Sequence, residues 1–482
     1  MKKLLRWILV LLLVLFVVLS INTLMAKSRQ IQVPSVEPAQ LDDAGAVQRF
    51  SSALRIQTVT YDDPAKLNVQ EFQAFQSTLE QSFPLVHAHL SREIVSGHSL
   101  LYRWQGQKDD SPVVVMGHFD VVPADATTWK HPPFSGEIVN GYVWGRGTLD
   151  DKSNVTAELE AVEFLLQKGF NPPQTIYLAF GHDEEGGGKG AAAIVDLLSS
   201  RGVKPDMVLD EGGAILDAMV PGVRVPVAMI GTSEKGYLTL DLTVEDPGGH
   251  SSSPPAHTAI GVVSEAIKKL EDHPLPAHLE GSAEQMLDYL APELPFIARF
   301  FLVNRWLFEP LIVQVMKTDQ SVSPLLRTTT AATMIQGGVK ENVLPAKAVA
   351  TVNFRIRPGE TRDSVIEFVR KTIGSERVKI TVRPAGMEPS PVSPADSKQF
   401  LLIQRTIREI FPSTVVVPGL VIGATDARHY SKICNNVFRF SPYIVKDEDL
   451  HGYHGIDEKL SVENYIRMIR FYIRFLQNLR GP

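Results

Sequence analysis

Residues 113–120 read VVVMGHFD, a short valine-rich run followed at once by a histidine and an aspartate. A continuous apolar run of this length is typical of a strand that is buried on both faces of a parallel sheet. The same pattern returns twice, at 175–180 before HDEE and at 207–209 before DEG. Helical apolar spacing over 155–166 and 191–198 separates these runs. The alternation predicts an α/β fold, with a mainly parallel sheet covered by helices on both faces.

Polar motifs accompany the predicted strands. GHFD follows the first strand, HDEE the second and DEG the third, while GTLDDK lies in the loop before the helix at 155–166. The acidic and imidazole groups of these motifs include His118, Asp120, Asp150, Glu184, Glu185, Asp210 and Glu211. In open α/β sheets the ligand crevice lies outside the carboxyl ends of the strands, so these side chains can converge there. So many converging carboxylates would repel one another without cations between them.

Bulk composition narrows the kind of metal and the kind of partner. The chain has 482 residues, 44% of them apolar, a net charge of -6 and one cysteine, Cys434. This length supports a large core and more than one domain. The acidic balance, with no basic stripe beyond the first thirty residues, argues against a nucleic-acid partner. A single cysteine excludes an internal disulfide and a cysteine-ligated zinc, so a metal site must use His, Asp and Glu, which suit zinc or another divalent first-row ion.

The pattern changes in the middle of the chain. Residues 237–244 alternate between apolar and polar side chains as a half-exposed strand does, and further strands are predicted at 328–335 and 348–356. Helices are predicted at 260–270 and 364–373. This order of elements predicts an α+β lid, an antiparallel sheet with helices on one face, inserted into the first domain.

Five parts of the chain follow from these patterns. Within the insertion, residues 274–324 are rich in Leu, Phe and Trp, contain FIARFFLVNRWLF and are predicted to form a helical excursion. Its apolar surface fits core, a partner contact or a membrane contact, with core as the default. After Pro394 the α/β pattern resumes and ends in a helix at 462–479. The predicted parts are an anchor or signal segment (1–26), a linker (27–45), a first catalytic part (46–232), the inserted lid (233–388) and a second catalytic part (389–482).

The first 26 residues differ from the rest. MKKLLRW is a basic start, residues 7–19 are an unbroken apolar run, and the wider stretch to Ala26 approaches the ~20 residues that span a bilayer. Cleavage after Ala26 would place Leu24 where a signal peptide needs a small residue, which favours an uncleaved single-pass anchor. The basic start would keep the N-terminus in the cytoplasm and place the body on the other side of the membrane. The alternative is a cleaved signal and a secreted or periplasmic body.

Longer motifs carry a family resemblance. They are HFDVVP, PPFSGEIVNGYVWGRGTLDDK, FGHDEEGGGKGA, VLDEGG, GGHSSSPP, RTTTAATMIQGGVKENVLP and HGIDEKLSVENY, in this order. Together they make the chain resemble the M20 family of zinc peptidases, in the branch of vacuolar carboxypeptidase S and the N-fatty-acyl-amino-acid synthase/hydrolases. The resemblance extends from about residue 47 to residue 479.

This resemblance implies a pair of zinc ions, for which Co2+ or Mn2+ can substitute. One ion would be bound by His118, Asp150 and Glu211, and the other by Asp150, Glu185 and His454, so that Asp150 bridges them. Asp210 is the alternative to Glu211 if the register slips by one residue, and the motif HGIDEKL favours His454 over the nearby His451. The resemblance also implies a cis peptide bond between Asp150 and Asp151.

Two further acidic residues would act beside the metals. Asp120 would orient His118 and tune its basicity. Glu184 would be the general base, which takes a proton from the water held between the metals and later gives it to the leaving amine. Adjacent residues of an extended chain point in opposite directions, so Glu184 and Glu185 are expected to face water and metal separately.

The lid and the last third of the chain would supply substrate contacts. His250, in GGHSSS, matches a histidine that reaches across a subunit or domain interface to the developing oxyanion; a plain turn histidine is the alternative. Asn342 and Arg355 match positions that hold the substrate's carboxylate or carbonyl. Arg428, in TDAR, is a further candidate for clamping a carboxylate, because a guanidinium binds one in bidentate fashion. Arg355 and Arg428 fit surface positions equally.

The predicted function is hydrolysis of an amide bond next to a free carboxylate, as in a carboxypeptidase or an N-acyl-amino-acid amidohydrolase. Its substrate would be a small peptide or an N-acyl amino acid, membrane lipid would be a partner through the N-terminus, and a homodimer is possible. One alternative is the reverse condensation of a fatty acid with an amino acid, with the apolar segment 274–324 as a lipid-facing mouth. Another is an inactive membrane-anchored ectodomain that only binds, although such proteins usually lose ligands or the base and all are present here.

Overall fold

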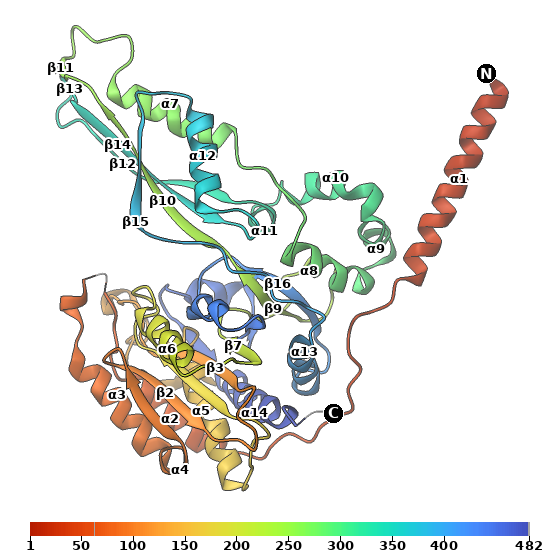
Figure 1. Ribbon diagram of the computed structural model, residues 1–482, viewed down its shortest axis with the longest axis vertical. Coiled ribbons are helices and arrows are strands. Elements are labelled where there is room, and N and C mark those ends of the chain that lie inside the picture. The colour runs from red at the N-terminus through yellow and green to blue at the C-terminus, as the bar shows by residue number, and fades with distance from the viewer. Residues whose placement is uncertain (62, 481–482) are drawn as a thin grey trace.

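The computed structural model describes residues 1–61 and 63–480, which form a ten-stranded sheet, a four-stranded sheet and two small sheets of three and two strands (Figure 1). The larger sheet has the strand order β1-β2-β6-β3-β7-β17-β9-β8-β18, with β16 paired to β9 off this path. Its central pairs β6–β3, β3–β7 and β7–β17 are parallel, while β1, β2 and β8 join it in antiparallel fashion. Its strands are β1 (Ser91–Val95), β2 (Ser99–Trp104), β3 (Val113–His118), β6 (Ile176–Gly181), β7 (Met207–Asp210), β8 (Ile215–Leu216), β9 (Val227–Glu234), β16 (Val415–Val421), β17 (Val437–Arg439) and β18 (Ile444–Val445).

Strand β3 shows why the sheet is covered on both faces. All six of its residues are buried. Val113 and Val115 pack into one hydrophobic cluster, and Val114 and Met116 pack into another on the opposite face. Helices α2 (Asp43–Leu54), α5 (Lys152–Gln167), α13 (Lys398–Ile410) and α14 (Val462–Asn478) cover the first face, and α6 (Lys189–Ser200) with the 3-10 helix η4 (Asp426–Lys432) covers the second. Helices α3 (Val69–Ser82) and α4 (Pro84–His89) extend the first layer. The α/β fold predicted from the apolar runs is confirmed.

The four-stranded sheet forms the lid. Its order is β12-β14-β10-β15 and all of its pairs are antiparallel. The strands are β10 (Gly236–Glu245), β12 (Thr329–Gly337), β14 (Lys347–Ile356) and β15 (Lys379–Met387), and the helices α7 (Ala259–Asp272) and α12 (Arg362–Ile373) pack on one face. Strand β15 was not predicted, because its residues are mostly exposed and its polar–apolar alternation covers only residues 379–383. A small two-stranded ribbon of β11 (Gly249–His250) and β13 (Val343–Leu344), which we call the lid ribbon, forms the end of the lid farthest from the larger sheet (Figure 1).

The segment predicted as a helical excursion is helical. It contains α8 (Ser282–Leu290), the 3-10 helix η3 (Ala291–Glu293), α9 (Phe296–Val303), α10 (Arg305–Met316) and α11 (Ser323–Leu326). Although α8 falls within the sequence range of the lid, it packs on β16 of the larger sheet and contributes Tyr289 and Leu290 to that core. The hydroxyl of Tyr289 donates a hydrogen bond to the carbonyl of Ala395 at 2.7 Å.

Helix α1 (Lys2–Met25) precedes the folded body and extends away from it (Figure 1). It is long and apolar enough to cross a membrane, with a mean hydropathy of 2.9 and little of its surface buried. Residues 27–42 then run along the body without forming a helix or strand. The amide of Gln30 exchanges two hydrogen bonds with the backbone of Val416 in β16, at 2.8 and 2.9 Å. The predicted linker is therefore attached to the body at this point.

Candidate metal centre

The polar motifs after the strands come together at one edge of the larger sheet. His118 ends β3, Glu184 and Glu185 lie in the turn after β6, and Glu211 follows β7. Asp150 lies in the loop before α5, whose first residues are buried beneath it. This placement follows from the parallel pairing of β3 with both β6 and β7, because parallel strands end at the same edge.

Asp150 is the centre of the cluster. Its Oδ1 lies 2.8 Å from Nε2 of His118, and its Oδ2 lies 3.2 Å from Nε2 of His454. The same nitrogen of His454 lies 3.0 Å from Oε1 of Glu185. Ligand atoms of Asp150, Glu185 and His454 all lie within 4.8 Å of one another. The side chain of His118 is buried and that of His454 is 54% exposed, so the cluster reaches from the sheet edge to solvent.

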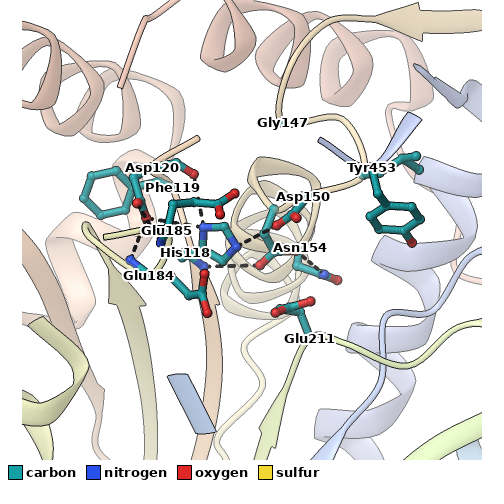
Figure 2. A network of polar contacts seen from close by, with 12 residues as sticks. His118, Phe119, Asp120, Gly147, Asp150, Asn154, Glu184, Glu185, Glu211 and Tyr453 are labelled. Atoms are coloured by element: carbon teal, nitrogen blue, oxygen red, sulfur yellow. Dashed lines mark hydrogen bonds and ion pairs between the residues drawn. The ribbon is translucent and has the colours of Figure 1, made fainter. Parts of the chain in front are cut away.

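Asp120 connects the two sides of this cluster (Figure 2). Its Oδ1 lies 3.3 Å from Nδ1 of His118, and the two oxygens of its carboxylate accept hydrogen bonds from the backbone N–H groups of Glu184 and Glu185, at 3.1 and 3.2 Å. The side chain is fully buried. The same ring nitrogen lies 3.1 Å from the backbone carbonyl of Asp120, so the main chain and the side chain of Asp120 together orient His118, while the carboxylate fixes the turn that carries both glutamates.

The loop that carries Asp150 is held from below by Glu458. This buried carboxylate accepts hydrogen bonds from the backbone N–H groups of Gly147 and Leu149, at 3.1 and 2.7 Å, and from the guanidinium of Arg146 at 2.6 Å. The peptide bond between Asp150 and Asp151 is cis. Glu458 was not singled out from the sequence, because its partners lie about three hundred residues away. The charged residue inside HGIDEKL was the available signal.

Glu211, and not Asp210, faces the cluster. The Asp210 carboxylate accepts hydrogen bonds from the backbone N–H groups of Glu211 and Ala427, at 3.0 and 2.8 Å, which direct it toward η4. The carboxylate of Glu211 points toward the space beside Asp150 (Figure 2). Of the two residues left open by the sequence, the geometry favours Glu211 as the ligand candidate.

The two adjacent glutamates diverge, but for a different reason than predicted. They lie in a tight turn and not in an extended chain, since the N–H of Gly187 bonds to the carbonyl of Glu184 at 3.0 Å. Within this turn, Glu185 points to His454 and Glu184 has its Oε1 3.7 Å from Nη1 of Arg428. The two side chains therefore point in different directions because they lie in a turn, and the prediction that they lie in an extended chain was wrong. Successive glycines after Glu185 permit the turn, and Gly187 and Gly188 have positive φ.

Burial governs the charges of the cluster. It raises the pKa of Glu184 and of Glu211 well above the ordinary carboxyl value, and the charge of Asp150 adds to the effect at Glu211. Burial acts in the same direction on Asp150, but hydrogen bonds from His118 and His454 outweigh it and lower the pKa of Asp150. Hydrogen bonds to Asp150 and then Glu185 raise the pKa of His454 to about 10.

These shifts indicate that the cluster favours positive charge at its centre. Desolvated carboxylates gathered around one point repel one another, and either protons or metal ions relieve this repulsion. Carboxylate oxygens combined with two imidazole nitrogens are ligands suited to a divalent first-row ion. The residues present therefore fit a metal centre.

Arg428 lies beside the cluster, where its side chain is 13% exposed. Its guanidinium donates to the carbonyls of Thr425 and Gly187, at 2.7 and 2.9 Å. It thereby ties the turn of Glu184 to η4. The preceding Thr425 is held in turn by Glu234, which accepts from its N–H at 2.9 Å and pairs with Arg439 at 3.1 Å.

The predicted lid residues are not in the cluster. His250 and Asn342 are exposed at the lid ribbon of β11 and β13, at the far end of the lid (Figure 1). The contacts of His250 among the described residues are local, with its Nδ1 2.8 Å from the hydroxyl of Ser252. Arg355 lies at the opposite end of β14, close to the passage from β9 into β10, and its guanidinium stacks over the ring of Tyr237 at 4.9 Å.

Comparisons with known proteins agree with this arrangement. Residues 114–478 match the family model described as Peptidase family M20/M25/M40. The chain is 40% identical over 96% of its length to a probable carboxypeptidase S-like 2 of Dictyostelium discoideum, covering 92% of that protein. It is also 40% identical over 92% of its length to the N-fatty-acyl-amino acid synthase/hydrolase PM20D1 of Xenopus tropicalis, covering 87% of that protein.

A solved structure shares the fold. The M20 family metallo-carboxypeptidase Sso-CP2 of Sulfolobus solfataricus superposes with a TM-score of 0.67 at 18% identity, over 91% of this chain and 99% of that one. The match to the family model covers both the metal centre and the lid, and the relatives extend it to nearly the whole chain. The chain therefore belongs to peptidase family M20/M25/M40 and is a hydrolase that acts on amide bonds.

Proposed function

We propose that this protein is a two-zinc hydrolase that cleaves an amide bond next to a free carboxylate. The observation that carries the proposal is the shared carboxylate of Asp150, whose two oxygens face two different imidazoles, His118 at 2.8 Å and His454 at 3.2 Å. A carboxylate with one oxygen toward each of two ligand groups is what a bridging ligand between two metal ions requires.

The ligand sets follow from this centre. His118, Asp150 and Glu211 would hold one ion, and Asp150, Glu185 and His454 the other; Co2+ or Mn2+ could take the place of zinc. When bound, the ions would lower the pKa of the attacking water and polarise the scissile carbonyl. Asp120 would keep His118 in the orientation that binding needs, because it contacts the ring nitrogen that faces away from Asp150.

Glu184 would move the proton. It would accept a proton from the attacking water through a carboxylate oxygen and give it to the nitrogen of the leaving amine. Its turn is fixed by Asp120 from one side and by Arg428 from the other. Its burial raises its pKa, and a base whose pKa lies closer to the working pH is better matched to both halves of this transfer.

The lid would supply the remaining groups. His250 and Asn342 lie too far along the lid to act on the cluster of their own chain in the arrangement of Figure 1, so they would act on a second copy in a homodimer, or after movement of the lid. There His250 would stabilise the developing oxyanion and Asn342 would hold the substrate carbonyl. Arg355 and Arg428 would bind the free carboxylate, for which a guanidinium is suited.

The substrate would be a small peptide or an N-acyl amino acid. The names of the relatives include both carboxypeptidases and N-fatty-acyl-amino acid synthase/hydrolases, which supports either class. Synthesis of the conjugate by the reverse reaction is the second candidate, and the apolar helices α9 and α10 favour it because they offer a surface for an acyl chain. An inactive binding ectodomain is a weaker candidate, because every predicted ligand and the predicted base are present in the sequence.

The N-terminal helix would anchor the enzyme. Helix α1 meets the length of a bilayer span, and we propose that it holds the body on the non-cytoplasmic side as a single-pass anchor. Cleavage of this segment would give a secreted or periplasmic enzyme instead.

A substrate comparison tests the proposal. The purified zinc-loaded chain is given a set of dipeptides and a matched set of N-acyl amino acids, and release of the free amino acid is measured. Each positive substrate is repeated as its C-terminal amide. We expect hydrolysis of at least one class, with loss of most activity when the carboxylate is amidated. Equal rates on acids and amides would contradict the proposed carboxylate recognition, and no hydrolysis of either set would contradict the proposed function.

A further inference from the structure

Helix α1 is attached to the body through a single buried asparagine. Asn304, between α9 and α10, is fully buried, and its amide nitrogen donates to the carbonyl of Leu19 at 3.1 Å and to the hydroxyl of Thr23 at 3.0 Å. Its amide oxygen accepts from the side chain of Asn22 at 2.8 Å. Three hydrogen bonds therefore join this side chain to the last turns of α1. Buried polar groups are costly without partners, so these bonds favour docking of α1 over a free helix.

Neighbouring contacts reinforce this joint. Phe16 of α1 lies against Phe300 of α9, with ring centroids 5.9 Å apart, and Arg299 donates to the carbonyl of Ala26. Leu19 and Thr23 are the residues of α1 that become buried. The joint lies at the end of α1 that is nearest the body, and the rest of the helix projects beyond it (Figure 1).

Helices α9 and α10, residues 296–316, also present an apolar surface beside α1. Leu307, Leu311 and Val315 follow one another at four-residue spacing, which places them on one face of α10. The exposed large apolar residues of the two helices are Phe296, Ile297, Trp306, Leu307, Leu311 and Val315, with Ile297 at 73% and Trp306 at 66% exposure. Glu309 is the one acidic residue in 296–316. An apolar patch of this kind marks an interaction surface.

The pair α9–α10 is firmly connected to the catalytic body. Arg305 at the start of α10 pairs with Asp288 and, at 3.0 Å, with Glu284 of α8. Helix α8 packs on β16 of the larger sheet. The direction of α1 is therefore transmitted through α9 and α8 to the sheet that carries the metal centre.

We propose that α9 and α10 form a membrane-embedded foot that lies in the leaflet next to the body, beside the retained helix α1. The continuity of the patch with a helix long and apolar enough to span a bilayer identifies the occupant as lipid. With 8 and 12 residues, α9 and α10 are too short to cross, so they lie along the interface. Trp306 suits the headgroup level. The inference rests on the proposed membrane anchoring and is independent of the proposed chemistry.

This arrangement gives α1 a second role. A free tether allows the body to rotate relative to the membrane, whereas a docked helix with an adjoining foot fixes which side of the body faces the lipid. Cleavage after residue 26 would remove the partners of Asn304 and leave its amide exposed to water next to an apolar surface. The joint therefore favours the retained anchor over the cleaved signal.

Lipid contact is tested on the full chain in phosphatidylcholine vesicles. Nitroxide labels are attached to Ile297→Cys and Leu311→Cys in a Cys434→Ser background. The control is a label at Glu271→Cys, an exposed position on α7. Collision with oxygen, which concentrates in lipid, is compared with collision with a water-soluble nickel complex. We expect oxygen to dominate at 297 and 311, and nickel to dominate at 271. Nickel access at 297 and 311 equal to that at 271 would overturn the foot. Protection from both reagents would overturn it as well, because it would show a protein partner.

Docking of α1 is tested by cross-linking in the same vesicles. Because the ring of Phe16 lies against that of Phe300 and this pair leaves Asn304 in place, the double variant Phe16→Cys/Phe300→Cys in the Cys434→Ser background is expected to be joined by a short bifunctional thiol reagent, whereas Phe16→Cys/Glu271→Cys is not. Equal yields for the two pairs would contradict docking. Hydrolysis of a soluble dipeptide by each labelled chain reports folding separately. A foot without activity would leave this inference intact and count against the proposed function, and activity without lipid contact would do the reverse.

Discussion

The candidate metal centre and the lid ribbon of β11 and β13 differ in how completely one chain assembles them. Around Asp150, side chains from four separate segments meet within hydrogen-bond distance, and buried carboxylates hold their backbones in place. In the lid ribbon, His250 and Asn342 are exposed, and the contacts of His250 among the described residues are with the ribbon itself. One chain thus brings together the residues that we propose to hold metal, and leaves exposed the residues that we propose to meet the substrate's oxyanion.

The difference has a physical basis. Carboxylates of the cluster are desolvated, so their position is set by strong local forces that a single chain can supply. The polar side chains of His250 and Asn342 need no protein partner while they are hydrated. His250 and Asn342 would gain a partner only if a second surface covered the lid ribbon.

Replacement of Asp150 should have the largest effect on the metal half. In Asp150→Ala both proposed ions would lose a ligand, and the imidazoles of His118 and His454 would lose the carboxylate that lies between them. We expect loss of both zinc ions and of activity, by more than about 10⁴-fold. Metal analysis of the purified protein checks this, with the exposed Asp110→Ala as a control of the same chemistry. Two zinc ions and full activity in Asp150→Ala would show that the carboxylate does not bridge.

Glu184→Gln separates the base from the ligands. It keeps the shape of the side chain but removes the proton acceptor, so kcat should fall about 10²–10⁴-fold while the zinc content stays at that of the unmodified enzyme. Steady-state kinetics and metal analysis on the same sample provide both values. A loss of one zinc ion would mean that Glu184 is a ligand and that it exchanges roles with Glu185.

His250→Ala addresses the lid half directly. We expect kcat to fall about 10²–10³-fold with zinc retained, the range for removal of one oxyanion donor. Mixing this variant with Glu184→Gln distinguishes a partner's lid from the chain's own, because a mixed dimer then has one site with intact base and intact histidine. Activity regained on mixing supports action across the dimer. If the mixture is no more active than its components, the histidine serves its own chain after lid movement.

Glu458→Gln should have the smallest effect of these changes. The amide keeps the shape of the support under Asp150 but cannot accept all the hydrogen bonds from Gly147, Leu149 and Arg146. Zinc affinity is expected to fall about 10–100-fold, as for other groups that orient metal ligands. Competition with a chelator measures this affinity. Unchanged affinity would show that the loop of Asp150 is rigid without its carboxylate support.

Much of the catalytic sheet could be predicted from the sequence, because its strands are short apolar runs with metal-type residues directly after them. β3, β6 and β7 begin and end within about two residues of the predicted runs. The edge strand β15 escaped prediction, because its residues KITVRPAGM are mostly solvent-exposed and Pro384 ends its polar–apolar alternation after five residues. Edge strands are determined by the neighbour they pair with, here β10, and not by their own composition.

The site was predictable in its residues and less so in its supports. His118, Asp150, Glu185 and His454 were found from motif order, and the structure brings them together. Glu458 and the packing of α8 were not found, because each depends on contacts between segments far apart in the chain. The turn at Glu184 was mistaken for extended chain, since glycine runs after a strand are compatible with both. The contact of Asn304 with α1 shows the same limit, because the two residues of α1 to which Asn304 donates lie more than 280 positions away.

Two metal ions that share Asp150 are the central element of the proposed mechanism. The direct measurement is a zinc titration of the chelator-stripped chain, in which bound metal per chain and hydrolysis are followed together. We predict two ions bound per chain, no activity in the stripped protein, and full activity only as the second ion binds. Full activity in the stripped protein, or a plateau of both binding and hydrolysis at one ion per chain, would contradict it.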